Sequence, residues 1–506
     1  MNIATLLRRA ARDHADRVAL RLGDEELTYR RFADDAARFA GFLLGEGAAP
    51  GQRVGFFLPN GPEYLVGLLG VWQAGGVGVP LNHLFGDAAL RHAIADSGAT
   101  HLVVPPGDVP RLTALLEGLP VAGHLLTTGP GGGFPAAVAG HEAVGPVVPR
   151  LDGDDALIMY TSGSTGVPKG VRQTHRNVVA QVEAVIDLYG IGPDDHALNC
   201  APLFHVGGLQ LVSLPVLLRG GEITMMARWD PVAWLELAAR LRPTYGIAVA
   251  TMAVDIGNRT AGSPVVLDSF RVFMYGGSRT PSAVVRRLEE GIGVPPIEIY
   301  GQTEQNGLAV SRGSGEPRRA GAMGHPLEQI VQVRVVPPGG DDVPPGSDEV
   351  GELWVRGDAV TPGYWNGGDP GAATGAEKWV DGWFRTGDLV RRDADGWLSY
   401  VDRIDDMIVS GGENVFPQMV EEHLADCPDL AEVAVVGTPH ERWIEQVTAV
   451  VVPTRPGVTV DDVLGWCATN ANLRGMLTPR RVEIVEALPR TGSGKLDRPA
   501  LRRSLG

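Results

Sequence analysis

Apolar strands alternate with amphipathic helices through the first part of the chain, and this alternation restricts the possible folds more than any other feature. A strand, a crossover helix and a second strand in this order make a βαβ unit, whose strands lie parallel in one sheet. The hydrophobic spacing predicts helices at 3–13, 28–43, 62–74, 178–188 and 208–218, and strands at 18–22, 53–58, 76–80, 196–201 and 222–226. We therefore expect an α/β fold.

The chain is too long for one ordinary core, because 506 residues exceed the size at which a single core stops growing. Gly- and Pro-rich turns with short strands over 334–397 predict a small β subdomain. The pattern changes again near Asp402, where strands at 407–410, 432–436, 447–452 and 481–485 combine with helices at 417–425 and 460–473. We expect domains at 1–402 and 403–506. The segment GPGGGFPAAVAG from Gly129 is interpreted as a loop.

Composition excludes several classes of protein. The net charge is −16 and no basic tract occurs that could neutralise phosphates, so we expect no nucleic-acid partner. The longest apolar stretches, such as 64–72, are too short for a membrane span, and the charged N-terminal segment is not typical of a secretory signal. The three cysteines (Cys200, Cys427 and Cys467) form no Cys/His cluster, which argues against a zinc site or a disulfide framework and favours a cytoplasmic location.

The segment YTSGSTGVPKG at 160–170 is the sharpest local motif. Its glycines let backbone N–H groups approach an anion, its hydroxyls add donors and its lysine adds charge. It is not a Walker A loop, since no G-K-[ST] follows the first glycine at the required spacing. An apolar strand at 156–160 precedes it, and we expect a helix after it. Only three lysines occur in the chain, Lys169, Lys378 and Lys495, and two of them lie in such loops.

Further motifs follow in a fixed order: PLFHVGG at 202–208, YGQTE at 300–304, GELWVRG at 351–357, GYWN at 363–366, WFRTGD at 383–388, DRIDDMIVSGGENVFP at 402–417 and PRTGSGKLDR at 489–498. Together with the 160–170 loop, they resemble the adenylate-forming (ANL) superfamily over almost the whole chain, and most of all its AMP-forming acyl- and aryl-CoA synthetases. The resemblance implies a large N-terminal domain of mixed and parallel sheets flanked by helices, a small β subdomain, and a mobile C-terminal α+β domain.

The resemblance also implies the reaction. ATP and an organic acid would form acyl-AMP with release of pyrophosphate, and the acyl group would then pass to the thiol of coenzyme A. Lys495, Glu304, Thr165, Lys169 and His205 would be catalytic, with Glu304 holding Mg²⁺ because a hard cation prefers carboxylate oxygen. ATP would contact Thr161, Ser162, Gly163, Ser164, Thr165, Gly166, Lys169, Gly277, Ser278, Tyr300, Gly301, Gln302, Thr303, Asp388, Arg403 and Lys495.

The acyl pocket implied by the resemblance comprises His205, Val206, Gly208, Thr251, Met252, Asp255, Gly276 and Gly301. Its many small residues predict a wide pocket for a hydrophobic, bulky monocarboxylic acid. The alternative is that backbone packing requires those glycines and that the pocket has ordinary width. Coenzyme A would contact Gly411, Gly412, Trp443 and Arg480 after the C-terminal domain rotates about Asp405.

Three positions depart from the family pattern. Met419 stands where relatives carry an acidic residue, and the run at 476–480 lacks an aromatic and a basic residue that relatives use near coenzyme A. These departures leave a second hypothesis open, in which the acyl group passes to a carrier protein or a partner enzyme. A monomer and a homodimer both remain possible.

Overall fold

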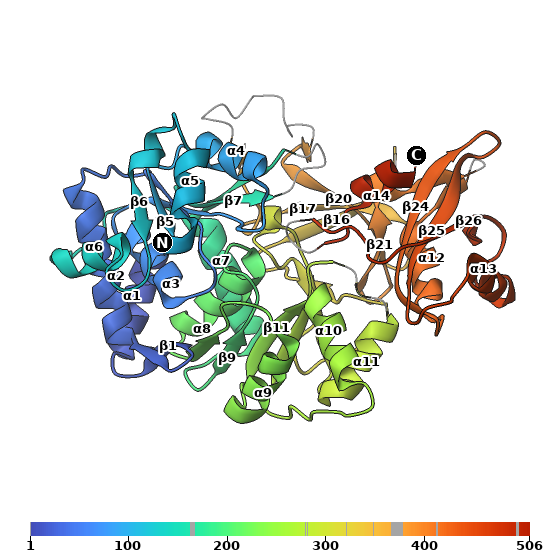
Figure 1. Cartoon of the computed structure of the whole chain (residues 1–506), viewed down its shortest axis with the longest axis horizontal. Helices are drawn as coiled ribbons and strands as arrows, with labels where there is room; N and C mark the ends of the chain where they lie inside the picture. The colour runs from blue at the N-terminus through green and yellow to red at the C-terminus, as the bar shows by residue number, and fades with distance from the viewer. Residues whose placement is uncertain are drawn as a thin grey trace.

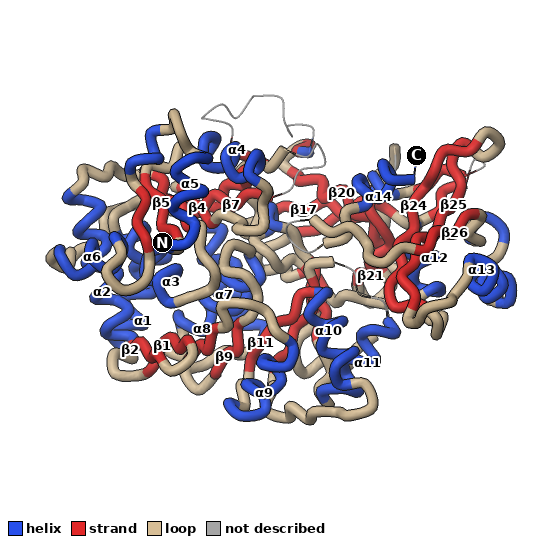
Figure 2. The backbone as a smooth tube through the Cα atoms, viewed as in Figure 1, coloured by secondary structure: helices blue, strands red, loops and turns tan. Residues whose placement is uncertain are grey.

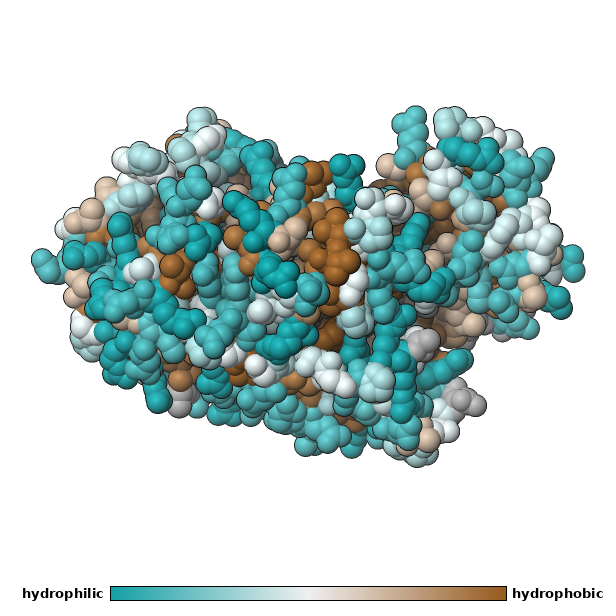
Figure 3. Space-filling model, turned by 90° about the horizontal axis from the view of Figure 1, so that it is seen from below, coloured by the Kyte–Doolittle hydropathy of each residue, from teal (hydrophilic) through white to brown (hydrophobic). Residues whose placement is uncertain are grey.

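The computed structural model describes residues 2–161, 167–278, 280, 282–319, 321–337, 339–347, 349–365, 378–410, 413–491 and 495–505, without the side chains of residues 122, 123 and 414. A large body built from the first four-fifths of the chain carries a smaller lobe built from its last hundred residues (Figures 1 and 2). In the space-filling view the smaller lobe, at the right, projects from the body, and hydrophobic residues gather near the middle of that face (Figure 3). No described helix is long and apolar enough to cross a membrane.

The first sheet of the body has the strand order β18-β8-β7-β4-β3-β5-β6 among the described residues. Its strands β3 to β7 pair in parallel, as the βαβ rhythm predicts. Their bounds are β3 (Arg53–Phe56), β4 (Val77–Pro80), β5 (His101–Val104), β6 (Leu125–Thr127), β7 (Asp155–Thr161), β8 (Lys169–Thr174) and β18 (Tyr364–Trp365). The helices of this region are α2 (Tyr29–Gly45), α3 (Pro62–Gln73), α4 (Asp87–Ser97), α5 (Val109–Leu115) and α6 (Gly133–Gly140).

The second sheet has the order β15-β14-β13-β12-β11-β9-β10-β1-β2. Its bounds are β1 (Val18–Leu22), β2 (Glu25–Thr28), β9 (His196–Asn199), β10 (Glu222–Met225), β11 (Tyr245–Val249), β12 (Val272–Gly276), β13 (Ile297–Tyr300), β14 (Val310–Ser311) and β15 (His325–Pro326). Its helices are α8 (Leu214–Leu218), α9 (Pro231–Leu241), α10 (Ala250–Thr260) and α11 (Ser282–Ile292), with α1 (Ile3–Asp13) packed on α8. The mixed and parallel pairing in both sheets confirms the predicted α/β fold.

Helix α7 (His175–Tyr189) packs against β7 and β8 of the first sheet and against α8 of the second. Thr174 caps its N-terminus in a capping box with Asn177, and Gly190 ends it in the left-handed conformation. Its buried residues form a broad face, while Arg176, Glu183 and Asp187 are exposed on the other side. It therefore joins the two sheets into one hydrophobic core.

Antiparallel strands form the small β subdomain, which the turn-rich segment predicts. They are β16 (Gln332–Val336), β17 (Gly351–Arg356), β19 (Trp379–Val380), β20 (Trp383–Arg392) and β21 (Leu398–Arg403). The smaller lobe contains β22 (Ile408–Ser410), β23 (Glu413–Val415), β24 (Leu430–His440), β25 (Ile444–Pro453) and β26 (Arg481–Ile484), with helices α12 (Pro417–Leu424), α13 (Val460–Thr469) and α14 (Arg498–Leu505).

Two sequence-based expectations are wrong. The segment after Gly129 is not all loop: α6 spans Gly133–Gly140, because Phe134 and Ala137 are buried on one face, and the Phe134 ring lies 4.7 Å from that of Phe39. The 160–170 motif is followed by a strand rather than a helix. Strand β8 pairs antiparallel with β7, with Thr161 opposite Lys169, so the motif joins two neighbouring strands.

Candidate active site

The β7–β8 hairpin brings Lys169 next to the GYWN motif. Strand β18 pairs antiparallel with β8, with Tyr364 opposite Val171. The Lys169 ammonium lies 5.7 Å from the centre of the Tyr364 ring, within the range of a cation–π contact. Ser162, Gly163, Ser164, Thr165 and Gly166 lie outside the described residues. Their predicted contacts with phosphate stay predictions.

Tyr364 also reaches the predicted metal ligand. Its hydroxyl donates to Glu304 Oε1 at 2.8 Å, and the Thr361 N–H donates to the Glu304 carbonyl at 2.8 Å. Glu304 belongs to a short 3₁₀ helix (Thr303–Gln305), and the Thr303 carbonyl accepts from Gln173 Nε2 of β8. Three segments that are far apart in sequence therefore meet around Glu304, and Tyr364 contacts its carboxylate.

Asp388 is the centre of a second polar cluster. Its side chain is buried, and its Oδ2 accepts from the Tyr300 hydroxyl and from Gln302 Nε2, both at 2.6 Å. Arg403 lies opposite Asp388 on β21, with 3.5 Å between Nη1 and Oδ1. Burial raises the pKa of Tyr300, and the Asp388 carboxylate raises it further. Burial opposes the charge of Arg403, but Asp388 and the other acidic groups around it together raise the pKa of Arg403.

Gly277 and Ser278 follow the carboxyl end of β12 and are exposed. Gly276 and Gly301 are required by close backbone packing. A Cβ at Gly276 would lie 2.5 Å from the Ile299 carbonyl oxygen, and a Cβ at Gly301 would lie 2.4 Å from that of Gly307. These contacts favour the packing interpretation for these two glycines over a role in widening the pocket.

The small lobe brings Lys495 to this region. Burial lowers the pKa of the Lys495 ammonium and Arg403 lowers it further, whereas Asp388 and Glu304 raise it. The side chain still reaches solvent, but protein atoms surround the ammonium closely enough to desolvate it. Two contacts dock the lobe on the body: the Ser282 N–H donates to Glu422 at 3.2 Å, and Arg286 and Asp426 lie 3.4 Å apart. The structure therefore brings together the predicted groups Lys495, Glu304, Asp388 and Arg403.

His205 lies close enough to Lys495 for their charges to interact. Burial lowers the pKa of His205 to about 4, and Lys495 contributes to the shift. His205 is therefore neutral near pH 7, and its Nδ1 accepts a long hydrogen bond from the Gly207 N–H at 3.5 Å. The ring of the preceding residue, Phe204, packs edge-on against His83.

The other predicted acyl-pocket residues occupy several settings. Met252 packs in a hydrophobic cluster, with its sulfur 3.7 Å from that of Cys200. Asp255 accepts from the Trp229 indole at 2.8 Å. Val206 is buried. The backbone carbonyl of Gly208 accepts a hydrogen bond from Asn199 Nδ2. Thr251 is half-buried at the start of α10.

The predicted coenzyme A residues lie in the small lobe. Gly411 and Gly412 are outside the described residues. The guanidinium groups of Arg442 and Arg480 each lie 4.6 Å from the centre of the Trp443 ring. At the predicted hinge, Arg502 donates to the carbonyls of Asp405 and Asp406 at 3.2 and 3.1 Å. Trp443 is therefore already in contact with two cations in this arrangement.

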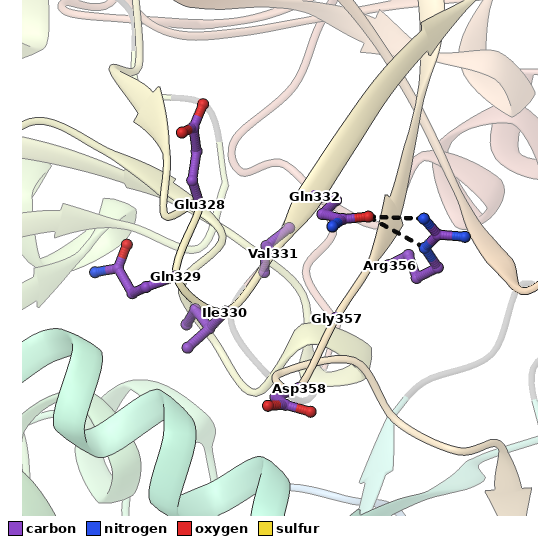
Figure 4. A pocket seen from close by; sticks show the side chains of 8 residues that line it. All are labelled: Glu328, Gln329, Ile330, Val331, Gln332, Arg356, Gly357 and Asp358. Carbon is purple, nitrogen blue, oxygen red and sulfur yellow. Dashed lines mark hydrogen bonds between the residues drawn. The ribbon is translucent and has the colours of Figure 1, made fainter.

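A separate shallow pocket lies at the edge of the β subdomain (Figure 4). Its lining is polar, and Gln332 Oε1 accepts from Arg356 at its rim. It is lined by Glu328, Gln329, Ile330, Val331, Gln332, Arg356, Gly357 and Asp358. None of these is a predicted site residue, and we assign the pocket no part in the reaction.

The sequence-based residue set omits two residues at this site. Tyr364, which contacts both Lys169 and Glu304, belongs to the GYWN motif, to which no role is assigned. Thr386 is part of WFRTGD, and its hydroxyl accepts from the Asp388 N–H at 3.0 Å. Membership of an ordered motif is the signal that could have identified both.

Comparisons with known proteins identify similar chains over nearly the whole length. The family described as AMP-binding enzyme matches residues 7–365, and the family described as AMP-binding enzyme C-terminal domain matches residues 419–495. The chain is 39% identical over 501 residues to a feruloyl-CoA synthase of an Amycolatopsis species, covering 98% of both chains. It is 32% identical to an indoleacetate–CoA ligase of Aromatoleum aromaticum, covering 99% of this chain and 98% of the relative.

Among solved structures, the ATP-bound MatB from Rhodopseudomonas palustris is similar over 100% of this chain and 99% of its own, with a TM-score of 0.90 and 30% identity. The likeness spans both the body and the small lobe. It supports a common fold throughout.

Proposed function

Since the chain belongs to the AMP-binding enzyme family and is an AMP-forming acid–thiol ligase, we propose that its acid substrate is an aromatic monocarboxylic acid of the hydroxycinnamate or arylacetate kind. The enzyme consumes ATP to form acyl-AMP and then transfers the acyl group to coenzyme A. The high similarity to a feruloyl-CoA synthase is the observation that carries the substrate proposal.

In the first half-reaction, a carboxylate oxygen attacks the α-phosphorus of ATP, the bond from that phosphorus to the β-phosphate bridging oxygen breaks, and pyrophosphate leaves. The chemistry consists mainly of positioning and of stabilising negative charge. We assign the role of stabilising cation to Lys495. We propose that Lys169 and the 161–166 segment contact the β- and γ-phosphates. The proximity of Lys495 to Glu304 and Asp388 supports this assignment.

Asp388 is suited to accept hydrogen bonds from the ribose hydroxyls, with Arg403 and Tyr300 holding its carboxylate in place. Gly277, Ser278, Gly301, Gln302 and Thr303 surround the proposed adenine and ribose sites. Glu304 offers the hard oxygen donor that Mg²⁺ prefers, and the Tyr364 hydroxyl fixes the orientation of that carboxylate. A bound Mg²⁺ would neutralise phosphate charge.

In the second half-reaction, the coenzyme A thiolate attacks the acyl carbonyl carbon, the bond from that carbon to the AMP oxygen breaks, and AMP leaves. We propose that the unit 403–506 rotates about Asp405 to exchange the Lys495 loop for Gly411 and Gly412. Trp443 and Arg480 would then approach coenzyme A. Asp405 lies in a 3₁₀ helix (Ile404–Asp406) between β21 and β22, and its carbonyl accepts a hydrogen bond from Arg502 of the small lobe, which supports this position for the hinge.

His205 is the proposed wall between the acid and the thiol, with Val206, Gly208, Thr251, Met252 and Asp255 around the acyl group. Its neutral imidazole at pH 7 adds no charge beside an aromatic ring. We place the enzyme in the cytoplasm, where ATP and coenzyme A are abundant and the three free cysteines stay reduced.

The test combines the purified chain with ATP, Mg²⁺ and a pooled set of acetic, malonic, medium-chain, cinnamic, hydroxycinnamic and arylacetic acids, with and without coenzyme A. Mass spectrometry reads acyl-AMP and acyl-CoA. Acyl-CoA formed chiefly from the aromatic acids supports the proposal, and preference for the short or aliphatic acids overturns it. Acyl-AMP that accumulates unchanged with coenzyme A present would favour transfer to a carrier protein, as the departures at Met419 and 476–480 suggest.

A further inference from the structure

Two histidines and one glutamate meet at the edge of the first sheet, away from the reaction centre. Glu46 follows the last residue of α2, His101 begins β5, and His124 immediately precedes β6. One ligand atom from each of the three lies within 4.8 Å of the others. No other group of this kind occurs among the described residues.

His101 is the fixed member of the cluster. Its side chain is 4% exposed, and its Nε2 has no hydrogen-bond partner among the described groups. A buried polar nitrogen without a partner carries a desolvation cost, so such an atom calls for a ligand or a functional explanation. The neighbouring rings of Phe42 and His124 limit how the imidazole can turn.

The hydrogen bonds around Thr100 accommodate a His101 tautomer that leaves Nε2 free. The Thr100 hydroxyl donates to the Arg53 carbonyl at 3.2 Å and accepts from Gln52 Nε2 at 2.8 Å. Its remaining acceptor capacity lies 3.0 Å from His101 Nδ1, so this arrangement is satisfied when the His101 proton sits on Nδ1. Nε2, which has no partner among the described groups, then keeps a free lone pair. This is the form in which histidine binds a metal, with its other nitrogen held by an outer partner.

Two imidazoles and one carboxylate form a donor set suited to zinc and its neighbours in the first transition series.

We propose that Glu46, His101 and His124 bind one zinc-class divalent ion, which joins the end of α2 to the β5–β6 edge of the sheet. Zinc–ligand bonds of about 2.0–2.1 Å require ligand atoms roughly 3.4 Å apart in a tetrahedral site. The cluster must therefore contract by up to about 1.4 Å, which rotation of the exposed side chains of Glu46 and His124 supplies. Three protein ligands leave one position for water.

The site is structural rather than catalytic, because β5 and β6 lie at the opposite edge of the sheet from β8 and β18. The ligands come from residues 46, 101 and 124, a spacing that no short motif covers. The cysteine pattern that argues against zinc in this chain does not bear on a site without sulfur.

The full chain, freed of metal with a chelator and free of ATP, is titrated with ZnCl₂ by calorimetry and with CoCl₂ by visible absorption. We expect one high-affinity ion per chain, with a cobalt spectrum typical of four or five ligands. His124→Ala and Glu46→Gln change exposed side chains and should each weaken binding at least tenfold. His141→Ala is the matched control, because His141 also packs on Phe42 but lies outside the cluster.

The melting temperature gives an independent measurement. Zinc should raise it in the wild type and in His141→Ala, and leave it unchanged in His124→Ala, because an ion that binds the folded state alone stabilises that state. Absence of one-to-one binding in the wild type would overturn the proposal. So would a zinc affinity in His124→Ala equal to that of the wild type.

Discussion

The charge of Lys495, the proposed stabilising cation, is subject to opposing effects: Asp388 and Glu304 favour it, while burial and Arg403 oppose it. A cation in this setting interacts strongly with any anion that replaces water beside it, because the local dielectric is low. The gain is greatest where negative charge develops as pyrophosphate departs.

Replacing this cation tests its role. Lys495→Ala should lower the rate of acyl-AMP formation by about 10³-fold, in line with the loss of a charged group that stabilises a transition state. ATP–pyrophosphate exchange measures it. Lys378→Ala, at a lysine packed on Phe384, is the matched control. Exchange at the wild-type rate in folded Lys495→Ala protein would remove Lys495 from the mechanism.

Tyr364→Phe should raise the KM for MgATP with a loss of about tenfold in kcat/KM, because the Glu304 carboxylate loses one hydrogen bond worth about 1–1.5 kcal/mol. Steady-state kinetics with varied MgATP measure it. Tyr275→Phe removes a similar Tyr–Glu hydrogen bond, 3.0 Å long, to Glu298. Equal effects of the two substitutions would show that the loss at Tyr364 is not specific to the site.

The residues of the candidate site could be predicted because they lie in motifs that follow a fixed order. The contacts between these residues could not be predicted. Nothing in the local sequence indicates that Tyr364 sits between Lys169 and Glu304, since that contact depends on β18 adding to the edge of β8. The Glu46–His101–His124 cluster was missed for the same reason: its members meet only after α2 packs on the sheet. Long-range pairing brings these groups together.

At the scale of elements, most bounds could be predicted from hydrophobic period and capping residues. The helix at 3–13 and the strand at 18–22 end at the predicted residues, and Thr28 caps α2. Helix α6 was missed because its Gly- and Pro-rich sequence has low helix propensity. Packing of Phe134 on Phe39 overrides that propensity.

Phe134→Ala should therefore lower the free energy of unfolding by about 3–4 kcal/mol through loss of buried area and creation of a cavity. Urea unfolding followed by circular dichroism measures it. Val266→Ala, at a side chain that is 67% exposed, should change stability by less than about 0.5 kcal/mol. A loss below about 1 kcal/mol for Phe134→Ala would mean that α6 contributes little to the core.

The junction between β21 and α12 should respond to pH. Burial raises the pKa of Asp402 to about 6, although the Gln418 N–H, which donates to it at 3.0 Å, opposes the shift. The folded chain then holds the proton up to about pH 6, while the unfolded chain releases it near 3.8. The protonated Asp402 carboxyl therefore stabilises the folded state fully below about pH 4, and this stabilisation is lost as the pH rises through 6.

Asp402→Asn should remove the pH dependence that Asp402 contributes. Between pH 4 and 7, the free energy of unfolding should then fall by up to about 3 kcal/mol less in the variant than in the wild type. Chemical unfolding at a series of pH values measures it, with the exposed Asp341→Asn as control. Parallel pH profiles for Asp402→Asn and the wild type would refute the assignment.

At the scale of the whole molecule, the proposed rotation lets one small lobe serve two reactions. Asp405→Pro should preserve acyl-AMP formation within a fewfold and reduce acyl-CoA formation by about 10²-fold or more, because proline fixes the backbone angle about which the lobe would turn. Separate assays of pyrophosphate release and acyl-CoA formation measure the split. Asp405→Ala should leave both rates nearly unchanged, and equal losses of both reactions in Asp405→Pro would contradict a hinge at this residue.

The scarcity of lysine gives the desolvated Lys495 a practical use. With three lysines in the chain and a lowered pKa at this one, an amine-reactive reagent at mildly alkaline pH finds more neutral amine at Lys495 than at an ordinary surface lysine. Covalent labelling of a single peptide would then act as a chemical reporter of the lobe. Its rate would change whenever the lobe leaves its docked position, without any engineered probe.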